Sequence, residues 1–470
     1  MRKTKIVCTI GPASQKEDVL KDLCRAGMNV ARLNFSHGTH EEQQKKLDLV
    51  KKVREELNLP IAIMLDTKGP EFRIKTFENG QITLKDGDPF TFTTEDGIGN
   101  QDHVSVSYAG LNKDLEPGDT ILLNNGLLNF RVDRIEGNNI ICTTVIGGVL
   151  SDRKSMSFPG KVLSQPYLSK QDQQDLLFGI KNSVEYIACS FVSCRKDLED
   201  VQNFLRKNGG EDIALIAKIE NQPGVDNIEE ICECCEGIMI GRGDMGVEIP
   251  FEELPSIQKQ LITKCRLLGK RVITATEMLE SMITNPRPTR AEISDVANAV
   301  YDGSSAIMLS GETAMGKYPV QAVEVMSKIA EHTENSINYA GRFYSYKFQI
   351  KNIGDSISHA TCGMAIDINA KAIAACSLSG MTVRMISRFR CPVDIVGITT
   401  NTRTWYKLAL SWGVTPVMCE ELPSTEVLFY TAKKLTQETL GLQEGDRIVI
   451  TGGVTNGISG NTNLIKIETY

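Results

Sequence analysis

The sequence predicts an α/β protein: a (β/α)₈ TIM barrel that carries an inserted β-rich lid domain and is followed by a C-terminal open α/β domain. Eight short, almost continuously apolar segments recur over the first 330 residues, each followed by a plausible helix except where the third is interrupted. Apolar strands joined by helices indicate a parallel sheet, and eight such units are typical of a closed barrel. The segments are KIVCTI (5–10), VARLNF (30–35), AIMLDT (62–67), YIACSF (186–191), ALIAKIE (214–220), GIMIGRGD (237–244), RVITATEM (271–278) and AIMLSGET (306–313).

Polar side chains gather where these apolar segments end. Barrel enzymes build their sites at the carboxyl ends of the strands, so we expect these side chains to share one mouth of the barrel. They are Arg32, Asn34, Asp66, Lys218, Glu220, Asp244, Thr276 and Glu312.

The character of the chain changes after the third strand. Short alternating segments such as GQITLKDGDPFTFTT appear there, with turn signals at GDP, EPGDT, NNG and EGNN. This pattern predicts an inserted, β-barrel-like domain over residues 70–169, which leaves residues 1–69 and 170–345 for the barrel. An insertion at the active end of a barrel is well placed to act as a lid, although a rigid appendage would give the same sequence pattern.

A second α/β pattern occupies residues 346–470. The segments AIAACSL, VDIVGITT, TPVMCE and DRIVITGG alternate with helices, LIKIET closes the chain, and together they predict a smaller open α/β domain. Its loops at residues 377–382 and 457–463 bear glycines and hydroxyls that favour anion binding at a helix start, although a plain strand-to-helix turn has the same residues.

Composition excludes several classes of function. The net charge is −7 and no lysine-rich run occurs, which argues against nucleic acid as the main ligand. We expect no membrane span, and the chain enters its first strand directly rather than through a signal peptide. The thirteen scattered cysteines fit a reducing cytoplasm. The group Cys232, Cys234 and Cys235 lacks zinc-site spacing, so we interpret these residues as structural thiols.

Lys218 and Glu220 carry the strongest chemical signal. Side chains two residues apart on a strand project to the same side, so a cation and a carboxylate share one face, and Asp244 ends the neighbouring apolar segment. Charge at buried strand ends is costly unless it is paired. Two carboxylates suit Mg²⁺ or Mn²⁺, and a lysine beside them suits a transferring phosphate. The grouping indicates metal-assisted phosphoryl chemistry.

Six motifs in order resemble those of the pyruvate kinase family over essentially the whole chain. They are RLNFSHG, LDTKGPEFR, KIEN, GRGDMGVE, ITATEMLESM and MLSGETAMGKYP. The resemblance implies phosphoryl transfer from phosphoenolpyruvate to ADP, giving pyruvate and ATP in the last step of glycolysis. It also implies a cytoplasmic homotetramer, in a bacterial form without the extra C-terminal phosphohistidine-type domain.

The resemblance implies two cation sites. Glu220 and Asp244 match the ligands of Mg²⁺ or Mn²⁺, and Lys218 matches the residue that stabilises the transferring phosphoryl group; a structural charge pair is the alternative for Lys218 and Glu220. The K⁺ site matches Asn34, Ser36, Asp66 and Thr67, although Asn34 and Ser36 would also fit as helix caps. Glu71 implies a need for K⁺, since family members with lysine there carry their own charge.

The remaining roles also follow from the resemblance. Arg32 and Arg73 match phosphate-contacting arginines, with surface ion pairs as the alternative. The substrate carboxylate is expected at Gly243, Asp244 and Thr276. Proton donation to the enolate is expected near Thr276, Ser310 and Glu312. The nucleotide is expected at Asn34, Phe35, Ser36, His37, Arg73 and Lys154, and a sugar-phosphate or nucleotide effector at Ser377, Ser379, Gly380 and Thr382.

Three departures from the family pattern accompany these matches. Around Lys154 the chain has KSMSFPG where the family usually has KGVNLPG, which weakens that assignment. Glu277 stands where glutamine is usual, and Gly241 where alanine is common.

Two other functions fit parts of the pattern. A Mg²⁺-dependent barrel lyase or aldolase acting on pyruvate enolate would need the metal carboxylates, but has no use for a K⁺ site, paired arginines or a lid. A sugar-phosphate sensor would need only the C-terminal loops, and would not need to keep the costly charges of Lys218, Glu220 and Asp244.

Overall fold

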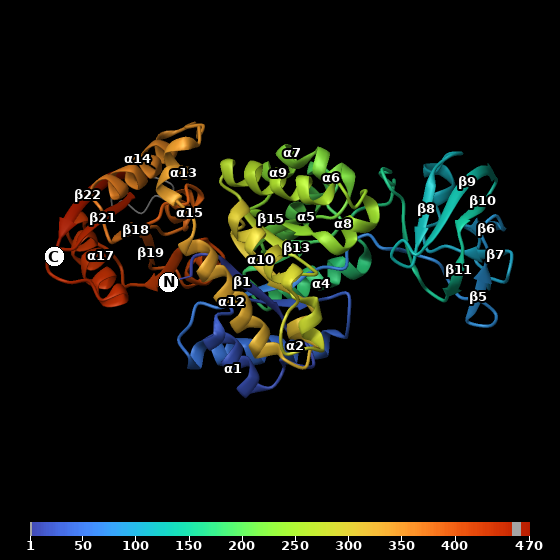
Figure 1. Cartoon of the computed structure of the whole chain (residues 1–470), viewed down its shortest axis with the longest axis horizontal. Coiled ribbons are helices and arrows are strands. Elements are labelled where there is room, and N and C mark those ends of the chain that lie inside the picture. The colour runs from blue at the N-terminus through green and yellow to red at the C-terminus, as the bar shows by residue number, and fades with distance from the viewer. Residues whose placement is uncertain (1, 454–461) are drawn as a thin grey trace.

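The predicted barrel is present in the computed structural model, which describes residues 2–453 and 462–470. Within those residues, eight parallel strands close into a barrel in the order β1-β17-β16-β15-β14-β13-β3-β2 (Figure 1). Its strands are β1 (Lys5–Thr9), β2 (Val30–Asn34), β3 (Ala62–Asp66), β13 (Tyr186–Cys189), β14 (Ala214–Ile219), β15 (Gly237–Gly241), β16 (Arg271–Ala275) and β17 (Ala306–Leu309). All eight apolar segments of the sequence therefore form the strands that were expected of them.

Helices surround the barrel and cover the outer face of its strands, so that the strands are buried on both faces. Side chains of β14, for example, are buried along its whole length, as expected where helices cover a parallel sheet. The helices are α1 (Glu17–Ala26), α2 (His40–Glu56), α4 (Lys170–Lys181), α5 (Arg195–Lys207), α6 (Gln222–Asp226), α7 (Ile228–Glu233), α8 (Arg242–Glu248), α9 (Leu254–Leu267), η1 (Glu280–Ile283), α10 (Arg290–Asp302), α11 (Gly311–Ala314), α12 (Pro319–Asn335) and α13 (Tyr339–Ser345). None of the described helices is both long and apolar enough to cross a membrane.

The inserted residues form a separate β-rich body after β3. Its main sheet has the order β4-β12-β8-β9-β10-β6-β7, and an isolated bridge between Ile74 and Val106 joins its two edges, which gives a barrel-like closure. Phe90, Phe92 and Phe130 pack edge to face in its core. The elements are β4 (Phe72–Arg73), β5 (Gln81–Leu84), β6 (Pro89–Thr93), β7 (His103–Ser105), α3 (Leu111–Asp114), β8 (Thr120–Leu123), β9 (Leu128–Glu136), β10 (Asn139–Ile146), β11 (Gly148–Ser151) and β12 (Ser155–Ser157).

The C-terminal residues form the expected open α/β domain. Its sheet has the order β20-β19-β18-β21-β22, and only β22 runs antiparallel to its neighbour among the described strands. The elements are α14 (Ile353–Asp367), β18 (Ala372–Cys376), α15 (Met381–Arg388), β19 (Asp394–Thr399), α16 (Thr402–Leu408), β20 (Val414–Met418), α17 (Thr425–Leu440), β21 (Arg447–Gly453) and β22 (Thr462–Thr469).

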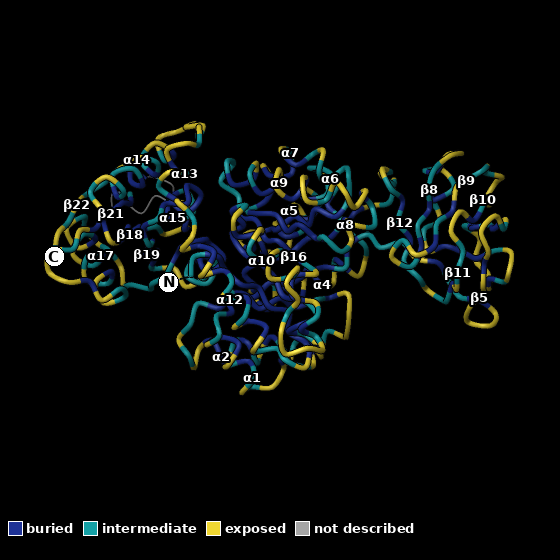
Figure 2. Tube along the Cα trace, viewed as in Figure 1, coloured by how far each residue is buried: buried dark blue, intermediate teal, exposed yellow. Residues whose placement is uncertain are grey.

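The two smaller domains lie at opposite ends of the barrel, as Figure 1 shows. The C-terminal domain contacts the residues that begin the strands. Lys5 Nζ donates to the Val414 carbonyl (2.7 Å), the Tyr186 hydroxyl donates to the Lys407 carbonyl (2.6 Å), and Arg271 Nη2 donates to Ser411 Oγ (3.1 Å). In Figure 2 the buried residues, in dark blue, run through the barrel, which lies between the two domains. The carboxyl ends of the strands therefore face the inserted domain.

One expected element ends earlier than the sequence suggested. The segment GIMIGRGD leaves the β conformation after Gly241, and Asp244 lies in the first turn of helix α8 rather than at a strand end. Gly241 and Gly243 look like strand punctuation in sequence, but here they lead directly into a helix.

Candidate active site

A cleft of about 530 Å³ lies between the carboxyl ends of the barrel strands and the inserted domain. From the barrel it is lined by Arg32, Asn34, Ser36, His37, Lys218 and Asp244, and from the insert by Arg73, Ser157 and Phe158, among others. Six of the residues expected at a site therefore line one cavity from the barrel side. A site at this end of the barrel agrees with the general rule for the fold.

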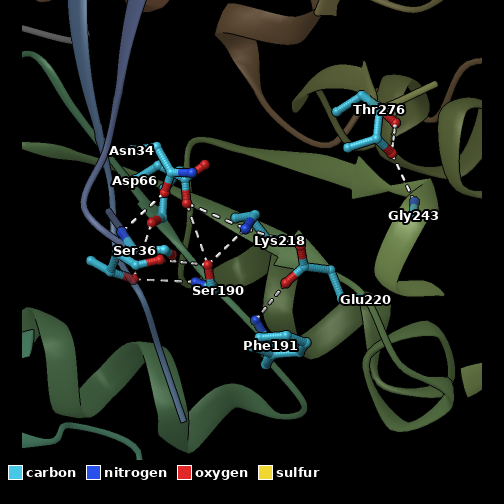
Figure 3. A network of polar contacts seen from close by, with 12 residues as sticks. Asn34, Ser36, Asp66, Ser190, Phe191, Lys218, Glu220, Gly243 and Thr276 are labelled. Atoms are coloured by element: carbon cyan, nitrogen blue, oxygen red, sulfur yellow. Dashed lines mark hydrogen bonds and ion pairs between the residues drawn. The ribbon is translucent and has the colours of Figure 1, made fainter. Parts of the chain in front are cut away.

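Lys218 stands at the centre of a buried polar network (Figure 3). Its Nζ lies 2.9 Å from Glu220 Oε1 and 3.3 Å from Asp66 Oδ1, and it donates a 2.7 Å hydrogen bond to Ser190 Oγ. Burial disfavours the ammonium ion, but the charges of Asp66 and Glu220 outweigh burial and raise the pKa of Lys218 above its usual value. The lysine is therefore a fixed positive charge at the wall of the cleft.

Asp66 joins Lys218 to a second cation. Its Oδ2 accepts a 2.6 Å hydrogen bond from Arg32 Nε, and Arg32 Nη1 donates to Thr9 Oγ1 at 2.9 Å. Burial would raise the pKa of Asp66, but Arg32 and Lys218 together hold it below the usual value. Asp66 thus positions both cations, and neither is a surface ion pair, since Arg32 is only 8% exposed.

The Glu220 carboxylate is fixed from two directions. Its Oε1 faces Lys218, and its Oε2 accepts a 2.9 Å hydrogen bond from the Phe191 N–H. A Cβ at Gly241 would lie 2.6 Å from Oε1 and 2.8 Å from Cγ, so the glycine makes room for this position. Burial, with a smaller contribution from Asp244, raises the pKa of Glu220 to about 7 against the attraction of Lys218.

The turn into helix α8 joins two of the expected substrate residues. The Gly243 N–H donates to Thr276 Oγ1 at 2.8 Å, and the Thr276 hydroxyl donates to the Ala275 carbonyl at 2.6 Å. Thr276 and Glu277 both adopt positive φ angles, 68° and 53°, a costly conformation for two successive residues other than glycine. In Figure 3 Gly243 and Thr276 lie apart from the Lys218 network, and Thr276 is not among the residues that line the cleft.

The oxygen-bearing residues predicted for K⁺ lie on adjacent strands. Asn34 and Asp66 are register partners on β2 and β3, and Asn34 Oδ1 accepts the Ser36 N–H at 3.1 Å. Gln43, which is buried, donates 2.8 Å hydrogen bonds to the carbonyls of Asn34 and His37 and so supports the loop. The four residues thus offer oxygens in one neighbourhood, as a monovalent site requires, although the oxygens of Asp66 already face Arg32 and Lys218.

The expected nucleotide residues are only partly brought together. Ser36, His37 and Arg73 line the cleft. The Phe35 side chain does not, because it packs in the core with the rings of Phe178 and His40 at 5.2 and 5.9 Å. The assignment of Phe35 to the nucleotide site therefore stays a prediction, without support from its side chain.

Lys154 is also absent from the cleft wall, where Lys161 and Lys68 appear instead. Its carbonyl accepts the Ile74 N–H within the inserted sheet. Arg73 pairs with Glu71, whose other partner is Lys68 at 3.0 Å.

Ser310 and Glu312 support the site from behind rather than facing the cleft. The Glu312 carboxylate accepts the N–H groups of Ser310 (2.7 Å) and Leu279 (3.0 Å), and it is 1% exposed. Burial raises its pKa. Glu312 therefore ties the end of β17 to the loop that follows Thr276, and its part in proton donation stays a prediction.

The expected effector loop is partly described. Gly380 has a φ of 76° and precedes helix α15, Ser379 is exposed, and Ser377 is half-buried. The Thr382 hydroxyl is buried against that of Thr462 at 2.5 Å. Of the second loop, residues 457–461 lie outside the described residues.

Two important residues were not singled out from the sequence. Ser190 follows β13 and bonds Lys218, and Glu248 at the end of α8 reaches Ser157 and the Phe158 N–H on the insert. Burial raises the pKa of Glu248 to about 7. Ser190 stood at a strand end and position could have suggested it, whereas the Glu248 contact depends on tertiary structure alone.

No three His, Cys, Asp or Glu side chains among the described residues gather closely enough to hold a metal ion by themselves. Two carboxylates completed by waters and substrate phosphates are, however, the usual environment of Mg²⁺ in phosphoryl-transfer sites. Glu220 and Asp244 fit that pattern, since both are hard oxygen ligands and Glu220 is 1% exposed. The thirteen cysteines are all free thiols.

The barrel, the lid-like insert and the cleft with its cations and paired carboxylates define the class: a barrel enzyme equipped for phosphate chemistry. Comparison with known proteins identifies the family within this class. Residues 1–323 match the family model described as pyruvate kinase, barrel domain, and residues 355–468 match pyruvate kinase, alpha/beta domain. The chain belongs to the pyruvate kinase family.

Individual relatives agree with this placement. The pyruvate kinase of Clostridium acetobutylicum is 45% identical over 100% of this chain and 99% of its own length. That of Staphylococcus saprophyticus is 45% identical, and the match covers 100% of this chain and 80% of the relative. The crystal structure of a pyruvate kinase from Cryptosporidium parvum superposes with a TM-score of 0.94 at 37% identity, covering 100% of this chain and 96% of that one. The alternative of a barrel lyase has no support among these relatives.

The raised pKa of Glu220 predicts a pH-dependent metal affinity. A protonated carboxyl group cannot ligate Mg²⁺, so affinity should rise as pH increases from 6 to 8, through the pKa of about 7. Calorimetric titration with MgCl₂ in two buffers of different ionisation enthalpy should show a proton released at pH 6.5 and almost none at pH 8.5.

The control for this titration is Glu220→Gln. It should bind Mg²⁺ at least about tenfold more weakly, and lose the dependence on pH, because a neutral ligand does not titrate. Equal Mg²⁺ affinity of the unmodified protein at pH 6 and pH 8 would contradict the assignment.

Proposed function

We propose that this chain transfers the phosphoryl group of phosphoenolpyruvate to ADP, giving pyruvate and ATP in the last step of glycolysis. The observation that carries the proposal is the gathering of Lys218, Arg32 and Asp244 around one cleft, with Glu220 bonded to Lys218 and the inserted domain forming the opposite wall. Membership of the pyruvate kinase family supports the same reaction.

The residues that line the cleft have separate roles in the proposed reaction. Lys218 and Arg32 hold negative phosphate oxygens, and because both are pinned by Asp66 they need little reorganisation when charge develops. Arg73 approaches from the insert, where it meets the nucleotide beside Ser36 and His37. The cleft between the two domains limits the access of water to the transferring group.

The substrate carboxylate belongs at the turn that begins α8. The Gly243 N–H donates to Thr276 Oγ1 at 2.8 Å, so the two groups lie side by side at this turn. Thr276 is the hydroxyl nearest to the enolate in this proposal and serves in its protonation, together with water. Ser310 and Glu312 hold the loop that carries Thr276.

Two cations complete the proposed site. Glu220 and Asp244 would hold Mg²⁺ or Mn²⁺, which when bound supplies Lewis-acid stabilisation of the phosphate oxygens. Asn34, Ser36, Asp66 and Thr67 would hold K⁺. The register pairing of Asn34 with Asp66 supports this set.

The cellular location, the oligomeric state and the effector of the protein belong to the same proposal. Thirteen free thiols suit a reducing cytoplasm. A homotetramer is the family expectation. The loop of Ser377, Ser379, Gly380 and Thr382 is the proposed effector site for a sugar phosphate or nucleotide.

A coupled assay tests the reaction directly. Purified protein with phosphoenolpyruvate, ADP, Mg²⁺ and K⁺ should form pyruvate, followed through NADH oxidation by lactate dehydrogenase. Omission of either cation should lower the rate. Absence of ADP-dependent pyruvate formation under full conditions would refute the proposal.

Replacing the central lysine should affect turnover more than binding. Lys218→Met is expected to lower kcat by about 10²–10³, because it removes a charge that acts most strongly in the transition state. Lys5→Met is the matched control, since Lys5 is equally buried on a barrel strand but lies at the opposite end, bonded to Val414. Nearly normal kcat in Lys218→Met would remove the lysine from the mechanism.

The identity of residue 71 should set the K⁺ requirement. Glu71 faces Arg73 and Lys68, so Glu71→Lys replaces a negative charge by a positive one within the cleft. We expect the rate without K⁺ to rise by about tenfold, equivalent to roughly 1.4 kcal/mol.

Glu71→Gln separates the two effects of this change. It frees Arg73 without adding a cation, so it should stay dependent on K⁺. If both variants lose the requirement equally, release of Arg73 rather than charge replacement is responsible.

A further inference from the structure

The inserted domain is attached to the barrel by two connecting segments. The first leaves strand β3 through Thr67, Lys68 and Gly69, and the second returns through residues 163–169 to helix α4. Any rotation of the insert must bend both segments. The points at which they are fastened therefore decide which residues move as one body.

A single carboxylate fastens both segments. Asp172 Oδ1 accepts the Gly69 N–H at 3.0 Å, while its Oδ2 accepts the Ser169 N–H at 3.1 Å and the Ser169 hydroxyl at 2.6 Å. Asp172 is 1% exposed, and its own N–H returns a 3.0 Å bond to Ser169 Oγ. The reciprocal bonds between Ser169 and Asp172 form an ordinary capping box at the start of α4. The bond to Gly69, 103 residues away, is not part of that motif.

Ser190 fastens the same two segments a second time. Its hydroxyl donates to the Thr67 carbonyl at 2.7 Å, and its carbonyl accepts the Tyr167 hydroxyl at 2.6 Å. Gly69 lies directly against it, since a Cβ at Gly69 would come within 2.9 Å of both Ser190 Cβ and the Ser190 carbonyl oxygen. With a φ of 70°, Gly69 also has a backbone conformation that favours glycine.

The same serine also holds the central lysine of the site. Ser190 Oγ accepts the 2.7 Å hydrogen bond from Lys218 Nζ and approaches Asp66 Oδ1 at 3.3 Å. Because one hydroxyl bonds both Thr67 and Lys218, a displacement of the first connecting segment is transmitted to the ammonium group.

We propose that Asp172 and Ser190 form a hinge clamp, which fastens both connecting segments to the barrel and links the hinge of the inserted domain to Lys218. Residues 70–166 then rotate as one body, and residues 67–69 and 167–169 belong to the barrel. Asp172, Tyr167 and Ser190 are positioning residues for Lys218. The link to phosphoryl transfer rests on the proposed function, whereas the clamp itself is a property of the fold.

Amide-resolved hydrogen–deuterium exchange of the full chain tests the clamp without reference to activity. Asp172→Asn is expected to speed exchange at both Gly69 and Ser169 by about tenfold or more, the scale of a lost charge-assisted hydrogen bond. Asp355→Asn is the matched control. Asp355 is likewise a buried carboxylate in the first turn of a helix and accepts the Lys351 N–H at 3.0 Å, but in the C-terminal domain. It should speed exchange near Lys351 and leave Gly69 and Ser169 unchanged.

A matched pair of tyrosine variants tests the link to Lys218. Tyr167→Phe and Tyr186→Phe each remove one buried hydroxyl that donates a 2.6 Å bond to a carbonyl, at Ser190 and at Lys407 respectively. Tyr167→Phe should lower kcat about three- to tenfold and leave KM nearly unchanged, because Lys218 acts most strongly on the transferring phosphoryl group. Tyr186→Phe should leave both unchanged.

Each outcome bears on one part of the proposal. If Asp172→Asn speeds exchange at Ser169 alone, Asp172 is a helix cap only and the clamp is overturned. If Tyr167→Phe and Tyr186→Phe have the same kcat and KM, the link from the hinge to Lys218 is overturned. If the unmodified protein forms no pyruvate, the proposed function fails, while the exchange measurements still decide whether the clamp exists.

Discussion

The buried ammonium group of Lys218 is the charge around which the site is built. A lysine that is 9% exposed on a barrel strand would be strongly destabilising without partners. Asp66 and Glu220 neutralise it from two sides, and Ser190 fills its third direction. Each partner is itself fixed, Asp66 by Arg32 and Glu220 by the Phe191 N–H. The energetic need to satisfy one buried charge therefore arranges most of the side chains that the chemistry requires.

The barrel also restricts where such a site can form. Its amino end is covered by the C-terminal domain, through contacts of residues that begin three of its strands. Its carboxyl end is left for the cleft beneath the inserted domain. Helix α8 contributes at both edges of that cleft, since Asp244 lies in its first turn and Glu248 at its last residue reaches the insert. A short helix thereby joins the expected metal ligand to the inserted domain.

Apolar segments and strand ends were sufficient to predict the fold and the centre of the site. All eight barrel strands and the five C-terminal strands formed as expected, because buried parallel strands have a distinctive composition. Residue type was a less reliable guide to which side chains line the cleft, because tertiary packing decides that. Phe35 belongs to a polar motif but turns into the core, and Lys154 is not among the residues that line the cleft, whereas Lys161 is. Ser190 carries no charge and lies outside the matched motifs, so only its position after a strand could have suggested it as a partner of Lys218.

The balance of charge explains why cations and phosphate would bind together here. Lys218 and Arg32 are positive, while Asp66, Glu220 and Asp244 are acidic, so with all three ionised the group carries one negative charge and repels phosphate. Burial, with a smaller contribution from Asp244, raises the pKa of Glu220, and protonation of this carboxylate lessens that excess. When a divalent cation is present the same group carries one positive charge with all three carboxylates ionised, and a phosphate dianion is attracted instead. Metal and phosphate affinities must then be linked reciprocally, since each relieves the charge that opposes the other.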